Sequence, residues 1–197
     1  MNGQKTGFFL DQKENRQKVS RYADGRSVLN CFSYTGAFSV YAFGGGALSV
    51  DSVDSSGNAI EKCERNLLLN GFNSYPHSCI KADALKYLDD MNSEYDLIIL
   101  DPPAFAKHTH QKSSAVRAYR HSNRQAIRKA KPGSFLFTFS CSQVIDNSLF
   151  SGIVHSAAIE AEREVKILQQ MTQGPDHPVS IFHPEGQYLK GILLYVF

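Results

Sequence analysis

Hydrophobic and polar positions follow two patterns along this chain, which predict strands separated by helices. Short apolar runs precede stretches in which apolar residues recur every three to four positions. The clearest run is Tyr95–Leu100, which is almost continuously apolar, as expected for a strand covered on both faces. Because strands and helices alternate over the whole chain, the pattern predicts an α/β fold with a mostly parallel sheet and helices on both faces.

The pattern also gives bounds for each element. The expected sheet strands are Ser27–Phe32, Ala47–Val53, Ser78–Ala82, Tyr95–Leu100, Ser134–Ser140, Val165–Gln170 and Gly186–Phe197. The expected helices are Gln12–Tyr22, Ala37–Phe43, Gly57–Asn70, Leu85–Met91, Ala115–Ala130 and Asn147–Ala161. Thr6–Asp11 is predicted to be a further short strand. We therefore expect an amino-terminal strand and helix extension over residues 1–26 and one domain over residues 27–197.

Polar residues follow the first three predicted sheet strands, where ligands of parallel α/β sheets bind. The turn from Asn30 to Gly36, which includes Phe32 and Tyr34, opens a helix and leaves backbone N–H groups free. Asp54 follows the second strand 18 residues beyond Gly36, a spacing that suits the ribose hydroxyls of an adenosine cofactor. Asp51 falls inside that strand and is the weaker candidate.

Asp83 follows the third strand and could accept from an adenine amine. A single acid at a strand end can also be only a helix cap. No Gly-x-Gly-x-x-Gly motif follows the first strand, which disfavours a nicotinamide dinucleotide and favours S-adenosylmethionine (SAM).

Asp101-Pro102-Pro103 follows the fourth strand and is the more informative motif. The two prolines remove donors and leave carbonyl oxygens as acceptors, so that the carboxylate and carbonyls could hold a flat base with an exocyclic amine. The alternative is a rigid turn from strand to loop.

Cys141 follows the fifth strand and is expected to face the same crevice as Asp101. Carbon C5 of a pyrimidine is a poor nucleophile, and addition of a thiolate to C6 activates it. Asp101 could protonate N3 of the same ring. The alternative is that a free cysteine is only a small packing residue of the core. We predict that role for Cys31, Cys63 and Cys79.

Charge is distributed unevenly along the 197 residues, whose net charge is +2. The segment Lys107–Lys131 holds eight basic and no acidic residues, so that the rest of the chain carries −6. A solvated helix face is one explanation, and contact with nucleic-acid phosphates is the one we favour. The candidate RNA-binding residues are Lys107, Lys112, Arg117, Arg120, Arg124 and Arg128.

Composition narrows the setting further. The four cysteines are scattered without metal-ligand spacing, which argues against a zinc site, and we expect no metal. No apolar run is long enough to cross a bilayer, and the first residues lack the apolar core of a signal peptide. We therefore expect a cytoplasmic protein with no membrane partner.

These residues together resemble the catalytic domain of the ribosomal RNA large-subunit methyltransferase I family, SAM-dependent enzymes that form 5-methylcytosine in large-subunit (23S) rRNA. The matching stretches run nearly the whole chain in order: Lys5–Gln12 with Asn15-Arg16, Val28–Gly36, Val53–Ser55, Asp101–Phe105, Thr138–Ser142, Asp176–Pro178, Glu185-Gly186 and Tyr188–Gly191. Departures are Asp51, where an apolar residue is expected, and Ala104, where other RNA cytosine methyltransferases carry a cysteine.

The resemblance implies a Rossmann-like, seven-stranded sheet whose last strand is antiparallel. It implies Cys141 as the nucleophile and Asp101 as its partner, in a mechanism with one cysteine. It also brings the extension into the cofactor pocket, which adds Phe9, Asp11, Gln12 and Arg16 to the candidate SAM-binding residues Asn30, Phe32, Tyr34, Gly36, Asp54, Asp83, Asp101 and Pro102.

For partners, the resemblance implies large-subunit rRNA, with a homodimer as a further candidate assembly. Members carry an amino-terminal RNA-binding PUA domain before this region, and we expect this chain to lack it. His177 and Lys190 also match the family, but the resemblance does not say what they do. Two other functions stay open: methylation of a nucleobase nitrogen through the Asp-Pro-Pro motif, and a non-catalytic RNA-binding remnant.

Overall fold

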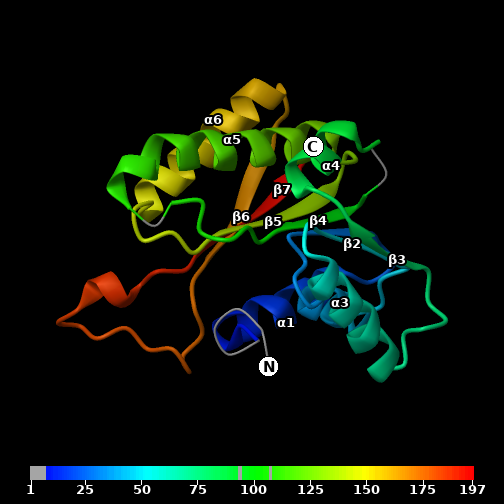
Figure 1. Ribbon diagram of the computed structural model, residues 1–197. Coiled ribbons are helices and arrows are strands. Elements are labelled where there is room, and N and C mark those ends of the chain that lie inside the picture. The colour runs from blue at the N-terminus through cyan, green and yellow to red at the C-terminus, as the bar shows by residue number, and fades with distance from the viewer. Residues whose placement is uncertain (1–7, 93–94, 107) are drawn as a thin grey trace.

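The computed structural model describes residues 8–92, 95–106 and 108–197 of the chain and confirms the alternation of strands and helices (Figure 1). The strands are β1 Ser27–Cys31, β2 Ser49–Asp54, β3 His77–Lys81, β4 Leu97–Leu100, β5 Ser134–Ser140, β6 Val165–Met171 and β7 Lys190–Val196. The α-helices are α1 Lys13–Tyr22, α2 Ala37–Gly44, α3 Gly57–Leu69, α4 Ala84–Asp90, α5 Lys112–Lys129 and α6 Asn147–Ala161. Short 3₁₀ turns lie at η1 Leu10–Gln12, η2 Thr109–Gln111 and η3 Pro184–Gly186.

The seven strands form one sheet in the order β3-β2-β1-β4-β5-β7-β6. Strands β1 to β5 pair in parallel, and β7 runs antiparallel to both β5 and β6, as the resemblance implied. The direction of strand addition reverses between β1 and β4, which are neighbours. Ligands of open α/β sheets bind at such a switch point, beyond the carboxyl ends of the strands.

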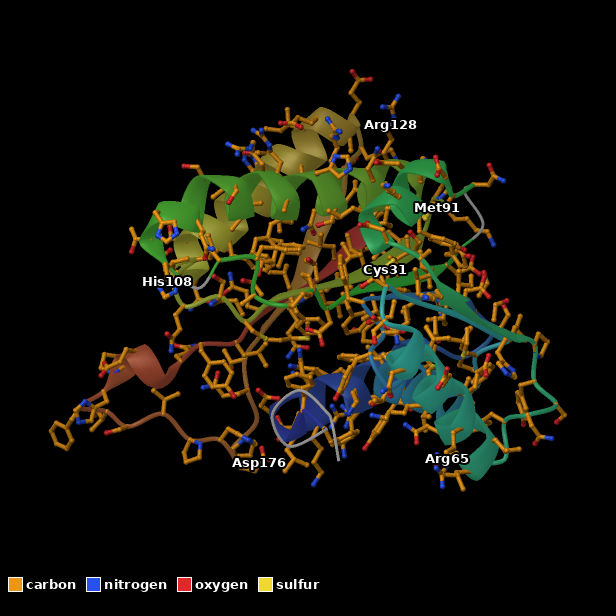
Figure 2. All side chains as sticks on the ribbon, viewed as in Figure 1. Cys31, Arg65, Met91, His108, Arg128 and Asp176 are labelled. Atoms are coloured by element: carbon orange, nitrogen blue, oxygen red, sulfur yellow. The ribbon has the colours of Figure 1, made fainter. Side chains whose placement is uncertain are left out.

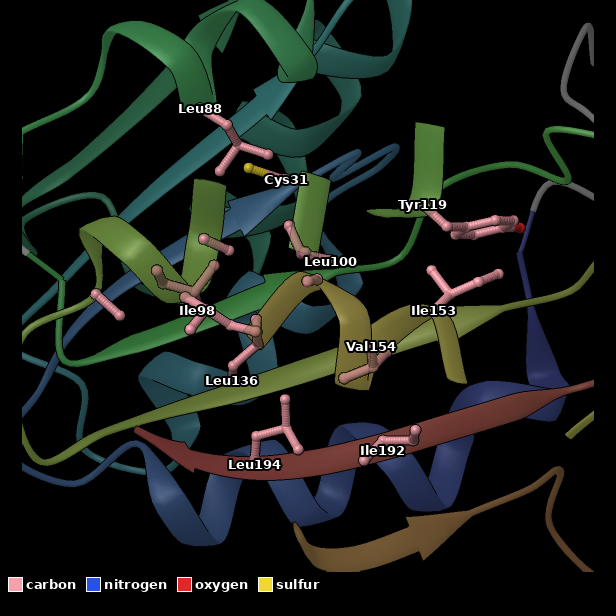
Figure 3. Close-up of a cluster of buried hydrophobic side chains, with 14 of the residues drawn as sticks. Cys31, Leu88, Ile98, Leu100, Tyr119, Leu136, Ile153, Val154, Ile192 and Leu194 are labelled. Carbon is pink, nitrogen blue, oxygen red and sulfur yellow. The ribbon is translucent and has the colours of Figure 1, made fainter. Parts of the chain in front are cut away.

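Helices cover both faces of the sheet, with α4, α5 and α6 on one side and α1, α2 and α3 on the other (Figure 1). Successive residues of β4 point to opposite faces, so that Ile98 packs in the core cluster under α5 and α6 while Leu97 and Ile99 pack in the second cluster. All four residues of β4 are buried, which explains the continuous apolar run. Figure 3 shows Ile98, Leu136 and Leu194 of the sheet beside side chains of α5 and α6.

The strand predicted at Thr6–Asp11 is wrong where the structure describes it. Phe8 and Phe9 are not in a strand, and Leu10–Gln12 form the 3₁₀ turn that leads into α1. Local contacts replace a strand ladder, because Arg16 donates to the Phe9 carbonyl at 2.7 Å and its guanidinium lies 4.5 Å from the centroid of the Phe8 ring. The first three residues of the motif Lys5–Gln12, namely Lys5, Thr6 and Gly7, lie outside the described residues.

Asp51 is explained by a hydrogen bond that sequence alone did not reveal. The Tyr95 hydroxyl donates to its carboxylate at 2.7 Å, and the Tyr87 and Tyr95 hydroxyls are 2.8 Å apart. A polar residue is therefore tolerated inside β2, because its carboxylate has a partner.

The connection between β6 and β7, residues 172–189, projects from the body as an arm (Figure 1). Its tip exposes Ile181 and Phe182, which are 88% and 85% exposed. Among the described residues, no helix is long and apolar enough to cross a membrane.

Candidate active site

The turn after β1 has a strained backbone. Phe32, Tyr34 and Gly36 all have positive φ, at 59°, 48° and 75°. Positive φ is uncommon for aromatic residues, and such outliers gather at ligand sites when the surroundings enforce them. The sequence indicates this turn but not its conformation, since only Gly36 signals positive φ in the sequence.

Neighbouring elements hold the turn in place. The Asp54 carboxylate accepts from the Tyr34 and Ser56 N–H groups, each at 2.9 Å. Ser33 N–H donates to the Val53 carbonyl at 2.9 Å, which ties the turn to β2. Asp54 therefore holds the turn after β1 in place, in addition to making the ribose contact that we predict for it.

Gly36 cannot accept a side chain without displacement. A Cβ atom at this position would lie 2.3 Å from Cys63 Sγ, well inside van der Waals contact. We expect Gly36→Ala to weaken SAM binding at least tenfold, because the left-handed conformation costs about 1–2 kcal/mol and the turn must also move. Isothermal titration calorimetry with SAM measures the loss.

Gly152→Ala is the matched control, since nothing lies within 4 Å of a Cβ atom there. The double variant Gly36→Ala/Cys63→Ala should recover part of the affinity, because it removes the overlap with the sulfur but not the backbone strain. Unchanged affinity in Gly36→Ala would contradict the prediction.

Asn30 and Asp83 have structural partners in addition to the roles predicted for them. Asn30 is fully buried and donates to Ser39 Oγ at 2.9 Å, which joins β1 to α2. Asp83 is the N-cap of α4 and accepts from the N–H groups of Leu85 and Lys86 at 2.9 and 3.2 Å. Their contacts with the cofactor stay predictions.

The amino-terminal segment reaches the carboxyl end of β4. Gln12 Nε2 donates to Asp101 Oδ1 at 3.0 Å, and Asn15 in turn donates to Gln12 Oε1 at 2.7 Å. The rings of Phe9 and Tyr34 meet edge to face with centroids 5.6 Å apart. Residues from the extension, the first turn and the Asp-Pro-Pro motif therefore lie together.

Asp101 lies in an environment that favours its protonated form. Burial raises the pKa of Asp101 to about 7, and the nearby negative charge of Asp11 adds to the rise. The Gln12 hydrogen bond and the positive charge of Arg16 oppose it. Arg16 is itself buried, and burial lowers its pKa. Near neutral pH, Asp101 can therefore both donate and accept a proton.

The Asp-Pro-Pro loop packs against the first turn and against α5. Pro102 is buried and Pro103 exposed. The Phe105 ring meets Phe32 edge to face at 6.0 Å between centroids and Tyr119 at 4.8 Å. These contacts bring the loops after β1 and β4 together, as the switch point requires.

Cys141 lies just beyond β5, next to the loop that follows β4. Cys141 is half-buried, as is Cys79, whereas Cys31 and Cys63 are buried. Three side chains interact electrostatically with Cys141: Tyr119 of α5, Tyr188 and Lys190. The sequence gives no sign that these three residues meet Cys141, because they are distant from it along the chain.

Tyr188 connects the two sides of the site. Its hydroxyl donates to Asp11 Oδ2 at 2.6 Å, and burial raises its pKa, as does the bond to Asp11. Asn15 also donates to the Thr172 carbonyl at 3.2 Å. Both ends of the arm therefore contact the amino-terminal segment.

Buried oxygen atoms around the first turn fit a polar cofactor. Within the described chain, Asp11 Oδ1, Asn15 Oδ1, Asn30 Oδ1 and Ser33 Oγ are buried without a hydrogen-bond partner. Asp11 interacts electrostatically with Asp101, and Asn15 is connected to Asp101 through Gln12. Asn30 and Ser33 are at the first turn. Unpaired buried polar atoms are costly, and a ligand with amino and hydroxyl groups would satisfy them.

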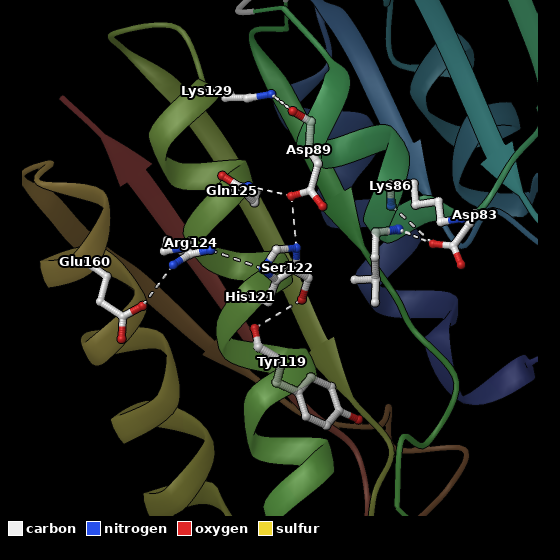
Figure 4. A network of polar contacts seen from close by, with 11 residues as sticks. Asp83, Lys86, Asp89, Tyr119, His121, Ser122, Arg124, Gln125, Lys129 and Glu160 are labelled. Carbon is white, nitrogen blue, oxygen red and sulfur yellow. Dashed lines mark hydrogen bonds and ion pairs between the residues drawn. The ribbon is translucent and has the colours of Figure 1, made fainter.

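The basic helix α5 is less one-sided than its sequence suggests. Arg120 and Arg124 form ion pairs with Glu160 of α6 at 3.4 and 3.6 Å. On another side, His121, Gln125 and Lys129 contact Asp89 of α4 (Figure 4). The charges of the segment itself share one sign, as the sequence shows, but acidic residues distant in sequence neutralise part of this surface.

Position along α5 also separates the candidate RNA contacts. Lys112 and Arg117 are exposed in the first part of α5, beside the loop that follows β4. Arg128 is exposed near the opposite end of the helix from His108 (Figure 2). Lys107 lies outside the described residues. Lys112 and Arg117 are therefore the best placed of these residues to approach RNA at the site.

The sheet order, the switch point and the polar strand ends define a Rossmann-like fold with a cofactor site beyond the strand ends. The S-adenosylmethionine-dependent methyltransferase family matches residues 1–180, and the chain belongs to this family. Its cofactor is SAM.

Curated relatives include the ribosomal RNA large subunit methyltransferase I of Aeromonas hydrophila, which is 43% identical over 196 residues covering 98% of this chain and 49% of the relative. The protein of the same name from Tolumonas auensis is 45% identical over 195 residues, covering 98% and 49%. The chain thus spans about half the length of these relatives.

Solved structures agree with the fold. A methyltransferase complexed with SAH superposes with a TM-score of 0.87 at 27% identity, covering 99% of this chain and 52% of the other. Trm5b from Pyrococcus abyssi superposes with a TM-score of 0.69 at 20% identity, covering 96% and 50%, and supports the fold alone.

Proposed function

We propose that this chain is the catalytic domain of a SAM-dependent RNA methyltransferase that methylates C5 of a cytosine in large-subunit rRNA through Cys141. The observation that carries the proposal is the arrangement of three loops. The strained turn after β1, Asp101 after β4 and Cys141 after β5 all follow neighbouring parallel strands at one edge of the sheet. The names of the curated relatives support rRNA as the substrate.

Each side chain has a defined role in the proposed reaction. The Cys141 thiolate adds to C6, forming an S–C6 bond, while the electron pair of C5=C6 moves toward N3 and Asp101 protonates N3. Bound SAM supplies an electrophilic methyl group. Once C5 has bonded to the methyl group, N3 returns its proton to Asp101 and the C5 hydrogen leaves to water as a proton. C5=C6 then forms again as the S–C6 bond breaks and its electron pair returns to Cys141.

The cofactor would be held by the amino-terminal segment and the strand ends. Asp11, Gln12 and Asn15 offer polar atoms beside Asp101, and the turn at Ser33–Gly36 offers a cradle for the amino-acid portion. We therefore propose residues 1–26 as part of the cofactor pocket and residues 27–197 as the catalytic domain. Asp54 and Asp83 are proposed to contact ribose and adenine.

RNA would approach over the start of α5, where Lys112 and Arg117 are exposed. The other candidates contribute less in this proposal, since Arg120 and Arg124 are paired with Glu160. A homodimer and a cytoplasmic location stay predictions from the sequence.

The test identifies the methylated atom. RNA incubated with the chain and SAM is digested to nucleosides and analysed by mass spectrometry, and we expect 5-methylcytidine. RNA that contains 5-fluorocytidine should also form a covalent complex that survives denaturing electrophoresis, since fluorine at C5 blocks release of the cysteine.

A nitrogen-methylated nucleoside without a covalent complex would favour the second candidate, in which Asp101 and the proline carbonyls hold an exocyclic amine. The raised pKa of Asp101 supports its contact with a base in either case. Absence of SAM binding in calorimetry would instead favour a non-catalytic RNA-binding remnant.

A further inference from the structure

Lys190 is a buried cation that the proposed mechanism does not yet use. Its side chain belongs to the first residue of β7 and the residue is only 3% exposed. In the β5–β7 ladder it is opposite Ser140, the residue that precedes Cys141. Strand pairing therefore holds the base of the Lys190 side chain beside the base of the cysteine loop.

The hydrogen bonds of Lys190 place its amine over that loop. Nζ donates to the Ser142 carbonyl at 2.7 Å and to the Tyr188 carbonyl at 2.6 Å. An ammonium has three N–H donors, so these two bonds leave one, and Nζ also interacts electrostatically with Cys141 and Asp146. Burial lowers the pKa of Lys190, and the charges of Cys141 and Asp146 oppose this. The two carbonyl acceptors also favour the protonated amine, because charge-assisted bonds are the stronger ones.

A lysine is rarely buried unless a charged partner compensates for the loss of water. Asp146 is already the N-cap of α6, where its carboxylate accepts from the Leu149 N–H at 2.8 Å. Cys141 is the other ionisable partner, and it is the residue whose ionised form the chemistry needs.

We infer that Lys190 is a positioning residue that stabilises the thiolate of Cys141 and fixes the loop carrying it. The inference rests on the proposed function in one respect, namely that the thiolate of Cys141 serves as the nucleophile. The thiol loses its proton to solvent, Lys190 keeps its own proton throughout, and the resulting ion pair holds the sulfur ready for addition to C6.

Other titratable groups also affect the charges of Cys141 and Lys190. Tyr119 of α5 and Tyr188 of the arm interact electrostatically with Cys141, and Asp146 at the start of α6 interacts electrostatically with Lys190. The charge of Asp101 acts on Tyr119, and the charges of Asp11 and Asp176 act on Tyr188. Burial raises the pKa of Tyr119 to about 12, so that this phenol stays neutral and adds no negative charge near neutral pH.

The requirement for a thiolate explains why a cation is useful here. Asp101 must be protonated to act on N3, and its protonated fraction falls as the pH rises through about 7. An ordinary cysteine ionises near pH 8.5, so that few molecules would hold both forms at once. A neighbouring cation lowers the pH at which the thiolate forms and widens the pH range in which both forms coexist.

The test measures the reactivity of Cys141 directly, without RNA or SAM. The folded chain is alkylated with iodoacetamide from pH 5.5 to 10, and peptide mass spectrometry gives the rate at Cys141 and at the half-exposed Cys79. For Lys190→Met we expect the midpoint for Cys141 to rise by about one pH unit, which corresponds to a rate about tenfold lower near pH 7. The Cys79 rate profile should not change.

Lys190→Arg keeps the charge and should keep the midpoint close to that of the unchanged chain, a result that a purely steric role does not produce. If Lys190→Met fails to fold by circular dichroism, the unchanged chain is compared with the same chain unfolded in guanidinium, where the midpoint of Cys141 should be higher. The inference would be overturned if Cys141 had the same midpoint in Lys190→Met as in the unchanged chain. If the variant does not fold, the same midpoint in the folded and the unfolded chain would overturn it. In that event, loss of methylation in Cys141→Ala would still support the proposed function.

Discussion

Cys141→Ala is expected to abolish methyl transfer while SAM binding stays within about twofold of the original affinity. In the proposed mechanism the sulfur forms the covalent bond that activates C5. No other cysteine is placed to replace it, because Cys31 and Cys63 are buried and Cys79 lies on β3. Losing nucleophilic activation of so unreactive a carbon should lower turnover by at least about 10⁴-fold. Radiolabelled methyl transfer measures turnover, and calorimetry measures SAM affinity.

The matched control is Cys79→Ala, which removes the other half-exposed thiol. Cys79 Sγ is 3.5 Å from Cys63 Sγ, so that this variant tests general effects of losing a sulfur near the cofactor turn. We expect it to retain most of its turnover. Substantial methyl transfer by Cys141→Ala, with the C5 product unchanged, would contradict the covalent mechanism.

Asp101→Asn is expected to lower methyl transfer by about 10²- to 10⁴-fold, the range typical for loss of a general acid. An amide can donate a hydrogen bond to N3 but cannot transfer a proton to it. The variant should retain the Gln12 contact, because the asparagine side chain still offers an oxygen where Asp101 Oδ1 now accepts at 3.0 Å. Single-turnover kinetics with saturating SAM measures the chemical step, and Asp90→Asn, at an exposed carboxylate, is the control.

The same substitution should change how stability depends on pH. Since burial raises the pKa of Asp101 to about 7, the stability contributed by its protonated form is lost as the pH rises through that value. Asp101→Asn has no such ionisation and should be more stable than the unchanged chain at pH 8, by on the order of 1 kcal/mol, with the difference closing below pH 5. Urea unfolding at both pH values measures this, and a destabilised variant at pH 8 would contradict the assigned environment of Asp101.

Local sequence determined most of the secondary structure of this chain. The bounds predicted for β5 and α6 are those observed, and most other strands and helices differ by one to three residues at an end. These elements were readable because apolar periodicity reports directly on burial, and Tyr95–Leu100 illustrates this best, since β4 is buried on both faces. The wrong strand at Thr6–Asp11 had apolar residues but no sheet neighbour, and pairing is not visible in a short run.

The sequence also determined which residue types could perform the chemistry. Asp101 and Cys141 were recognisable because each follows a strand, and the carboxyl ends of parallel strands meet at one edge. Tertiary structure decided what surrounds them. Gln12 reaches Asp101 across 89 positions, and Lys190 reaches the carbonyl of Ser142 across 48.

The basic segment likewise shows what the sequence reveals and what only the structure decides. Its charge was evident from the residues of α5, but Glu160 and Asp89 come from α6 and α4, and only helix packing brings them to it. Hydrophobic periodicity is a local property, because each residue meets the same neighbours along its own strand or helix. Proton affinity and charge pairing depend on distances between elements, which are set only when the strand order and the packing of helices on the sheet are established.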